Sequence, residues 1–88
     1  MKAKTIEVTF RNGRPFAAHL RLEGTRGACV RTREVTASLL VDLDERGHAL
    51  GIEILAFDGA TIAQINDVLA SLGHPPLSPA ELAPLRAA

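Results

Sequence analysis

Apolar and polar residues alternate along much of the first two thirds of the chain, which is the pattern of β-strands with one buried face. Asn12-Gly13, between the first two alternating segments, is a dipeptide typical of a tight hairpin turn. The third segment alternates more weakly than the others. The segments with this pattern are residues 4–10, 16–22, 28–35, 39–43 and 49–57. About five strands are therefore predicted.

The register of the first hairpin can be tested against this pattern. A two-residue turn at Asn12-Gly13 would place Phe10 opposite Pro15 and separate the apolar positions of the two strands. A shift by one residue would instead place Phe10 opposite Phe16 and Val8 opposite Ala18. We therefore predict a bulge or an odd-length loop in this hairpin, with Phe10 and Phe16 on the buried face.

The hydrophobic period changes from two to about 3.6 after Phe57, which predicts an amphipathic helix. Thr61-x-x-Gln64 resembles a capping box, which would start this helix. Gly73 stands where a glycine commonly follows the end of a helix. The apolar stripe of the helix consists of Ile62, Ile65, Val68, Leu69 and Leu72.

A second, short helix is predicted near the end of the chain. Ser78-Pro79-Ala80-Glu81 combines an N-cap serine, a first-turn proline and a glutamate three residues after the cap, whereas Pro84 limits the helix length. The prediction is one α+β domain: an antiparallel meander of about five strands in residues 1–57, and helices in residues 58–88 that pack on the sheet or on a partner subunit. Because these helices look too small to cover the whole apolar face, we expect a homo-oligomer.

The centre of the chain nearly spells a calcium-binding loop, with Asp42, Asp44, Gly47 and Glu53 at positions one, three, six and twelve. Arg46 stands at position five, where a ligand oxygen is needed, and the flanking segments alternate as strands do rather than as helices. We therefore predict a hairpin turn with no bound metal. Its structural residues would be Asp44, Gly47 and Gly51.

Four charged residues near this turn are candidates for contact with a partner or ligand. Glu53 interrupts an apolar strand, and alternation places it away from the buried face. Asp42 is expected to meet Arg31 or Arg33 across neighbouring strands. No cofactor is predicted from these residues, and no grouping of catalytic type is recognised, so the chain is predicted not to be an enzyme.

Composition narrows the function classes. Hydrophobic residues make up 47% of the chain, which excludes a wholly disordered protein. Cys29 is the single cysteine and is expected to be a small buried side chain without an intrachain disulfide. The chain has neither an apolar run of signal-peptide length nor one that could span a membrane, so a cytoplasmic location is expected.

The charges sum to zero but are unevenly distributed along the chain. Residues 1–35 contain eight basic and three acidic residues, whereas residues 36–88 contain two basic and seven acidic residues. A basic sheet surface could combine His19 with three arginines, Arg21, Arg31 and Arg33. The zero net charge does not favour nucleic acid, and the phenylalanines on which bases could stack are all expected to be buried. Nucleic acid is therefore the alternative partner and not the leading one.

The central stretch also resembles a known family. Val41-Asp42-x-Asp44-x-x-Gly47 followed by Gly51-Ile52-Glu53-Ile54-Leu55, with Arg33-Glu34-Val35 upstream, is similar to the small bacterial and archaeal proteins of the domain of unknown function 2283 family. The resemblance covers residues 16–57 and implies no activity, but it suggests an antitoxin-like or other partner-binding role. The leading hypothesis is a non-enzymatic protein-interaction module that forms homo-oligomers or pairs with another protein. The alternative is a weak nucleic-acid-binding regulator that uses the basic N-terminal strands.

Overall fold

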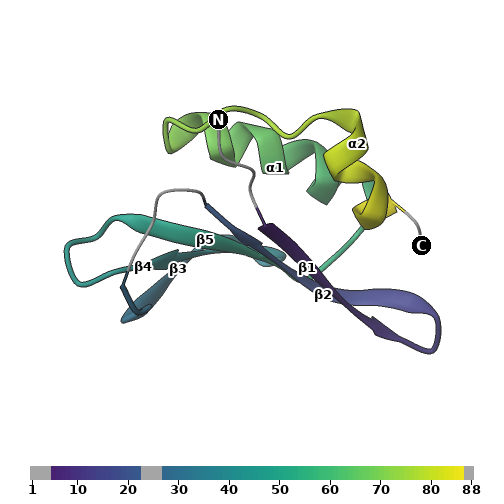
Figure 1. The fold of residues 1–88 in the computed structure, drawn as a ribbon, viewed down its shortest axis with the longest axis horizontal. Helices are drawn as coiled ribbons and strands as arrows, with labels where there is room; N and C mark the ends of the chain where they lie inside the picture. Colours follow the sequence, from purple (N-terminus) through teal and green to yellow (C-terminus); the bar gives the residue numbers. More distant parts are fainter. Residues whose placement is uncertain (1–4, 23–26, 87–88) are drawn as a thin grey trace.

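The computed structural model describes residues 5–22 and 27–86 as a five-stranded sheet with helices on one face (Figure 1). Every neighbouring pair of strands is antiparallel, which confirms the predicted α+β class. The elements are β1 (Thr5–Arg11), β2 (Arg14–Arg21), β3 (Arg31–Thr36), β4 (Leu39–Leu43), β5 (Ala49–Ile54), α1 (Gly59–Ser71), the short α2 (Pro79–Leu82) and the 3-10 helix η1 (Ala83–Arg86).

The order of the strands, β1-β2-β5-β4-β3, departs from the predicted meander at one point. β5 rather than β3 lies beside β2, and β3 occupies the far edge of the sheet. This arrangement suits the side chains, because Ile52 and Ile54 of β5 are fully buried at the centre. β3, in contrast, is exposed along nearly its whole length, as befits an edge strand.

The β1–β2 hairpin contains the predicted bulge. Val8 pairs with Ala18, as the apolar pattern requires, but the register shifts between Thr9 and Phe10, and Phe10 pairs with Pro15. The turn itself has two residues, and both adopt positive φ angles, 54° at Asn12 and 77° at Gly13. Such angles are those of the tight turn that matches the twist of a hairpin.

The predicted pairing of Phe10 with Phe16 is wrong, since Phe16 is the extra residue of the bulge. Phe10 and Phe16 are 53% and 50% exposed, so neither belongs to the core. The reason is the position of the hairpin tip, which extends beyond the helices (Figure 1). The bulge also turns Phe16 toward Arg11, whose guanidinium lies 4.0 Å from the centre of the Phe16 ring.

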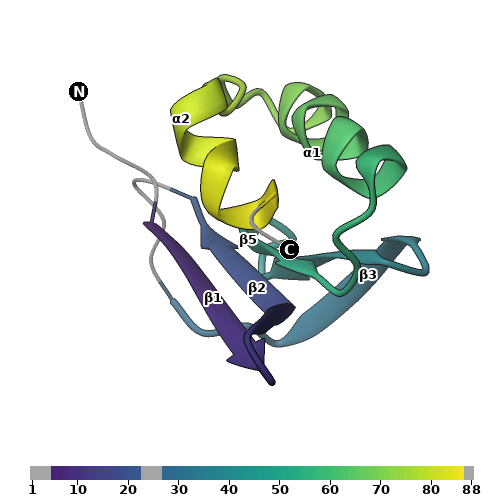
Figure 2. The same cartoon turned by 90° about the vertical axis from the view of Figure 1, so that its right-hand side faces the viewer.

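α1 crosses the sheet and buries its apolar stripe against it (Figure 2). The helix begins earlier than predicted, because Asp58 rather than Thr61 is the N-cap. The Asp58 carboxylate accepts hydrogen bonds from the Thr61 amide at 2.8 Å and from the Thr61 hydroxyl at 3.0 Å, and these bonds lower the pKa of Asp58. The predicted helix end is confirmed, since Gly73 follows it with a φ of 77°.

The segment after α1 returns over the sheet and completes the core. The predicted second helix start is confirmed, because Ser78 and Glu81 form a reciprocal capping box with Pro79 in the first turn. The side chain of Asn66 in α1 holds this segment, with its oxygen accepting the Leu77 amide at 2.8 Å. The residues that this segment buries are Leu77, Leu82 and Leu85.

The helices and the segment after them cover more of the apolar face than expected, although Phe10 and Phe16 stay exposed beyond them. Three leucines, spaced along a segment that the sequence predicts to be short or frayed, fill the space beside α1. Within residues 5–22 and 27–86, no helix has the length and apolar character needed to cross a membrane.

Candidate functional site

The face of the sheet opposite the helices carries the polar cluster that we consider the candidate site. Directly paired residues of antiparallel strands point to the same face. Ile52 and Val41 are paired and lie under the helices, so their neighbours Glu53 and Asp42 point to the other face. His19 is paired with Glu53 and lies there as well. We call this helix-free surface of the described chain the open face.

His19, from β2, reaches across β5 to Asp42, from β4. His19 Nε2 lies 2.9 Å from Asp42 Oδ2, and because a carboxylate only accepts, Nε2 donates in this hydrogen bond. The path crosses Gly51, which pairs with Asp42 on one side and with Arg21 on the other. A Cβ atom at Gly51 would lie 2.9 Å from His19 Nε2 and 2.7 Å from the Leu20 carbonyl oxygen. The absence of a side chain at Gly51 therefore allows the imidazole to lie over β5.

Asp42 is the charged residue that the open face buries most, with 7% of its surface exposed. Its buried Oδ1 atom has no hydrogen-bond partner among the described residues. Hydrogen bonding to the Asp42 side chain, burial and the charge of Asp42 all raise the pKa of Glu53, and His19 opposes them. Glu53 therefore lies close enough to Asp42 for the two side chains to interact.

A shallow hollow of about 300 Å³ adjoins this cluster. Its polar lining comes from His19 and Glu53 together with Glu7 and Thr9 of β1, and Ala17 and Leu55 contribute apolar surface. The cluster can hold and exchange protons and can accept hydrogen bonds from a bound group. Among the described residues, no three histidine, cysteine, aspartate or glutamate side chains are grouped so that they could hold a metal ion.

The β4–β5 turn is the structure that the calcium-like motif forms. Asp44 Oδ1 accepts hydrogen bonds from the Arg46 and His48 amides, each at 2.8 Å. These bonds, that of His48 first, lower the pKa of Asp44. Gly47 adopts a φ of 82°, which confirms its predicted structural role. The carboxylate oxygen that a cation would need is committed to the backbone of its own turn.

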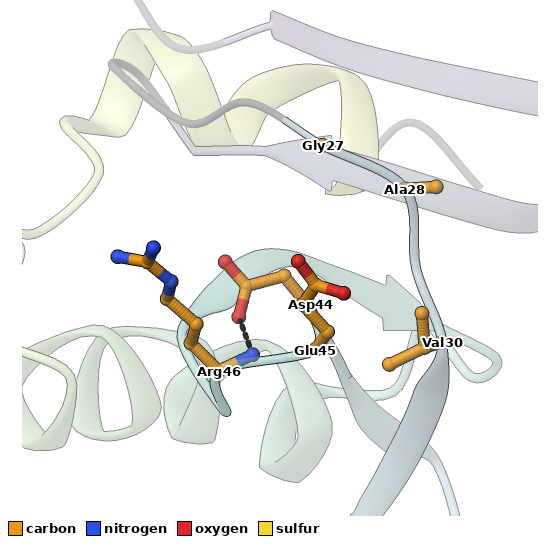
Figure 3. Close-up of a pocket in the computed structure, with 6 residues that line it drawn as sticks. All are labelled: Gly27, Ala28, Val30, Asp44, Glu45 and Arg46. Carbon is orange, nitrogen blue, oxygen red and sulfur yellow. Dashed lines mark hydrogen bonds between the residues drawn. The ribbon is translucent and has the colours of Figure 1, made fainter.

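A second hollow, of about 270 Å³, lies beside this turn (Figure 3). Ala28 and Val30 from the segment before β3 line one side, and Asp44, Glu45 and Arg46 line the other. It is separate from the His19–Asp42–Glu53 cluster, because none of those three residues lines it. Its shape follows from the turn, and its Asp44 side chain is already engaged.

The predicted contact between Asp42 and Arg31 or Arg33 is wrong. Arg31 pairs with Leu43 and Arg33 with Val41, which places both arginines on the helix side of the sheet, whereas Asp42 faces the other way opposite Thr32. The arginines pair with the residues on either side of Asp42, and an offset of one residue along a strand places a side chain on the opposite face of the sheet. Arg31 instead extends toward the β4–β5 turn, where its Nη2 atom would lie 3.5 Å from a Cβ at Gly47.

Three further expectations change with the structure. Gly51 lies within β5 rather than in the turn, and its role is to admit the His19 ring. Cys29 is exposed rather than buried, and its thiol donates to the Arg31 carbonyl oxygen at 3.3 Å. The basic surface proposed for nucleic acid does not form. His19 and Arg21 are two residues apart in β2 and lie on the open face, whereas Arg31 and Arg33 lie on the helix side of the sheet.

Of the residues singled out from the sequence, Asp42 and Glu53 meet in the candidate site. His19 was not assigned to that site, although its polar position in an alternating strand was a usable signal. The missing information was the strand order, since His19 and Asp42 are 23 residues apart and meet only because β2 and β4 flank β5.

Comparison with known proteins adds no relative. No family model, no curated protein and no solved structure matches this chain. The resemblance to the domain of unknown function 2283 family therefore stays a prediction, based on the residues of the β4–β5 hairpin.

Proposed function

We propose that this protein is a non-enzymatic interaction module that associates with itself. The observation that carries the proposal is the distribution of large apolar side chains outside the core. Five of them, all among the residues that the structure describes, are between 43% and 59% exposed. They are Phe10, Phe16, Val30, Val35 and Leu55.

These side chains lie around the sheet, and Val35 lines a hollow beside α1 together with Gln64 and Val68. Phe10 and Phe16 stand near the tip of the β1–β2 hairpin, and Leu55 follows β5 and lines the hollow of the open face. Val30 and Val35 belong to the β3 edge of the sheet. Exposed apolar patches, especially those with a polar rim, mark interaction sites. In this proposal the His19–Asp42–Glu53 cluster belongs to the polar surroundings of these side chains.

Light scattering coupled to size-exclusion chromatography tests the proposal over a series of micromolar concentrations. The expected mass at the higher concentrations is at least twice the 9.4 kDa of one chain. A constant mass of one chain throughout the series would contradict self-association. Repeating the measurement with a short nucleic acid at low and physiological salt distinguishes the alternative, because a salt-sensitive shift in elution would indicate a polyanion-binding protein.

A further inference from the structure

We propose that two copies of this chain pair through the free edges of β1, antiparallel and centred on Thr9, so that the two sheets become one. The inference rests on the proposed self-association and names the surface that performs it. Among the residues that the structure describes, β1 is an edge strand whose one sheet neighbour is β2. An unpaired edge presents backbone N–H and C=O groups that a second strand can satisfy.

The hairpin register indicates which groups of β1 face this edge. Hydrogen-bonded and non-hydrogen-bonded residue pairs alternate in an antiparallel ladder. Pro15 has no N–H, so its pair with Phe10 fits the non-hydrogen-bonded kind. The bulge lies on β2, and alternation along β1 then gives Val8 the same orientation as Phe10. The backbone groups of Phe10 and Val8 therefore point away from β2, toward a second copy.

Centring the pair on Thr9 places complementary side chains opposite one another. Thr9 meets Thr9 of the second copy, and Val8 meets Phe10, an aromatic side chain opposite a β-branched one. On the open face, Glu7 meets Arg11, and twofold symmetry forms this opposite-charge pair twice. These three kinds of cross-strand pair are the ones that stabilise antiparallel sheets. The match also covers Phe10, which the single chain leaves 53% exposed.

Other twofold registers of β1 lose the opposite-charge pair: centring on Val8 sets Glu7 opposite Thr9, and centring on Phe10 sets Arg11 opposite Thr9. Centring β1 on Glu7 would set the two Glu7 carboxylates directly opposite each other. The β3 edge is less suited, because centring on Arg33 or on Glu34 opposes identical charges, and centring on Thr32 opposes Arg31 to Arg33. The charges of β3 therefore discourage self-pairing, whereas those of β1 favour one register.

A charge exchange tests the register. Glu7→Arg alone and Arg11→Glu alone each place two like-charge pairs in the dimer, and each should raise the dimer dissociation constant by about tenfold or more. The double variant Glu7→Arg/Arg11→Glu restores opposite charges and should return the constant to within about threefold of wild type. Arg33→Glu on the β3 edge is the matched control and should leave the constant unchanged. Circular dichroism confirms that each variant is folded.

A cross-link tests the same register without altering charge. In a Cys29→Ser background, Thr9→Cys should form an intermolecular disulfide under mild oxidation, because non-hydrogen-bonded partners bring their Cβ atoms close. Thr32→Cys, an exposed threonine on β3, is the control and should remain uncross-linked. A wild-type dimer that ignores the charge exchange and does not cross-link at Thr9 would overturn the β1 interface and leave self-association standing. A wild-type monomer would overturn both.

Discussion

Replacing Gly51 by alanine should disrupt the candidate site through a single methyl group. The new Cβ would lie 2.7 Å from the Leu20 carbonyl oxygen and 2.9 Å from His19 Nε2, closer than such atoms approach in folded proteins. Forcing a group into a packed site costs about 1–3 kcal/mol. Displacing the imidazole would also leave the buried Asp42 carboxylate without its His19 donor, at a further cost of about 1–3 kcal/mol. The free energy of unfolding should therefore fall by at least about 2 kcal/mol.

Urea unfolding followed by circular dichroism measures this change, with Gly59→Ala as the control. Gly59 has no atom within 4 Å of an added Cβ and starts α1, so alanine there should be neutral or stabilising by up to about 1 kcal/mol. In a His19→Ala background, Gly51→Ala should cost less, because only the contact with the Leu20 carbonyl remains. A change within about 0.5 kcal/mol of wild type for Gly51→Ala would refute the close approach of β2 and β5.

Glu53→Gln removes repulsion from Asp42 and should raise the free energy of unfolding by roughly 0.2–1 kcal/mol near neutral pH. Because folding raises the pKa of Glu53, the wild type should lose stability as pH rises above the ordinary pKa of 4.5. The denaturant midpoints of the variant and the wild type should therefore converge in acid. A difference in midpoint that does not depend on pH would contradict this prediction. In the same unfolding assay, Gly47→Val should lower the free energy of unfolding by more than about 1 kcal/mol, because Gly47 has a positive φ. Arg46→Ala should change it by no more than about 0.5 kcal/mol. Equal effects of the two variants would contradict the positive φ at Gly47. Calorimetric titration with millimolar calcium should give no binding, since Asp44 already accepts two amides of its own turn, and micromolar affinity would overturn that reading.

The parts of the fold that depend on local pattern were predictable. Alternation with period two indicated the strands, and the conflict between the Asn12-Gly13 turn and the apolar positions indicated the bulge. The capping box at Ser78 and the glycine after α1 were likewise local signals. Such features depend on residues within a few positions of one another, so the sequence alone contains the needed information.

The parts that depend on distant pairing were not predictable. Gly51 was predicted to be a turn residue, but it makes room for the His19 ring. This role depends on β5 lying beside β2, which the sequence pattern does not indicate. Phe10 has the spacing of a core residue, yet it lies past the end of the helical layer and is exposed. Three leucines in a segment that looked frayed complete the core, because Asn66 and the Ser78 cap hold that segment in place. Strand order and tertiary contacts decide each of these outcomes.

Amide hydrogen exchange at Val8 and Phe10, measured by NMR at increasing protein concentration, tests the central claim most directly. In the proposed dimer these two amides point to the second copy, so their protection should rise with concentration and follow the fraction of dimer. The Thr9 amide faces β2 and should stay protected at every concentration, which provides an internal reference. Rapid exchange of Val8 and Phe10 at all concentrations, in a sample that light scattering shows to be dimeric, would contradict pairing through β1.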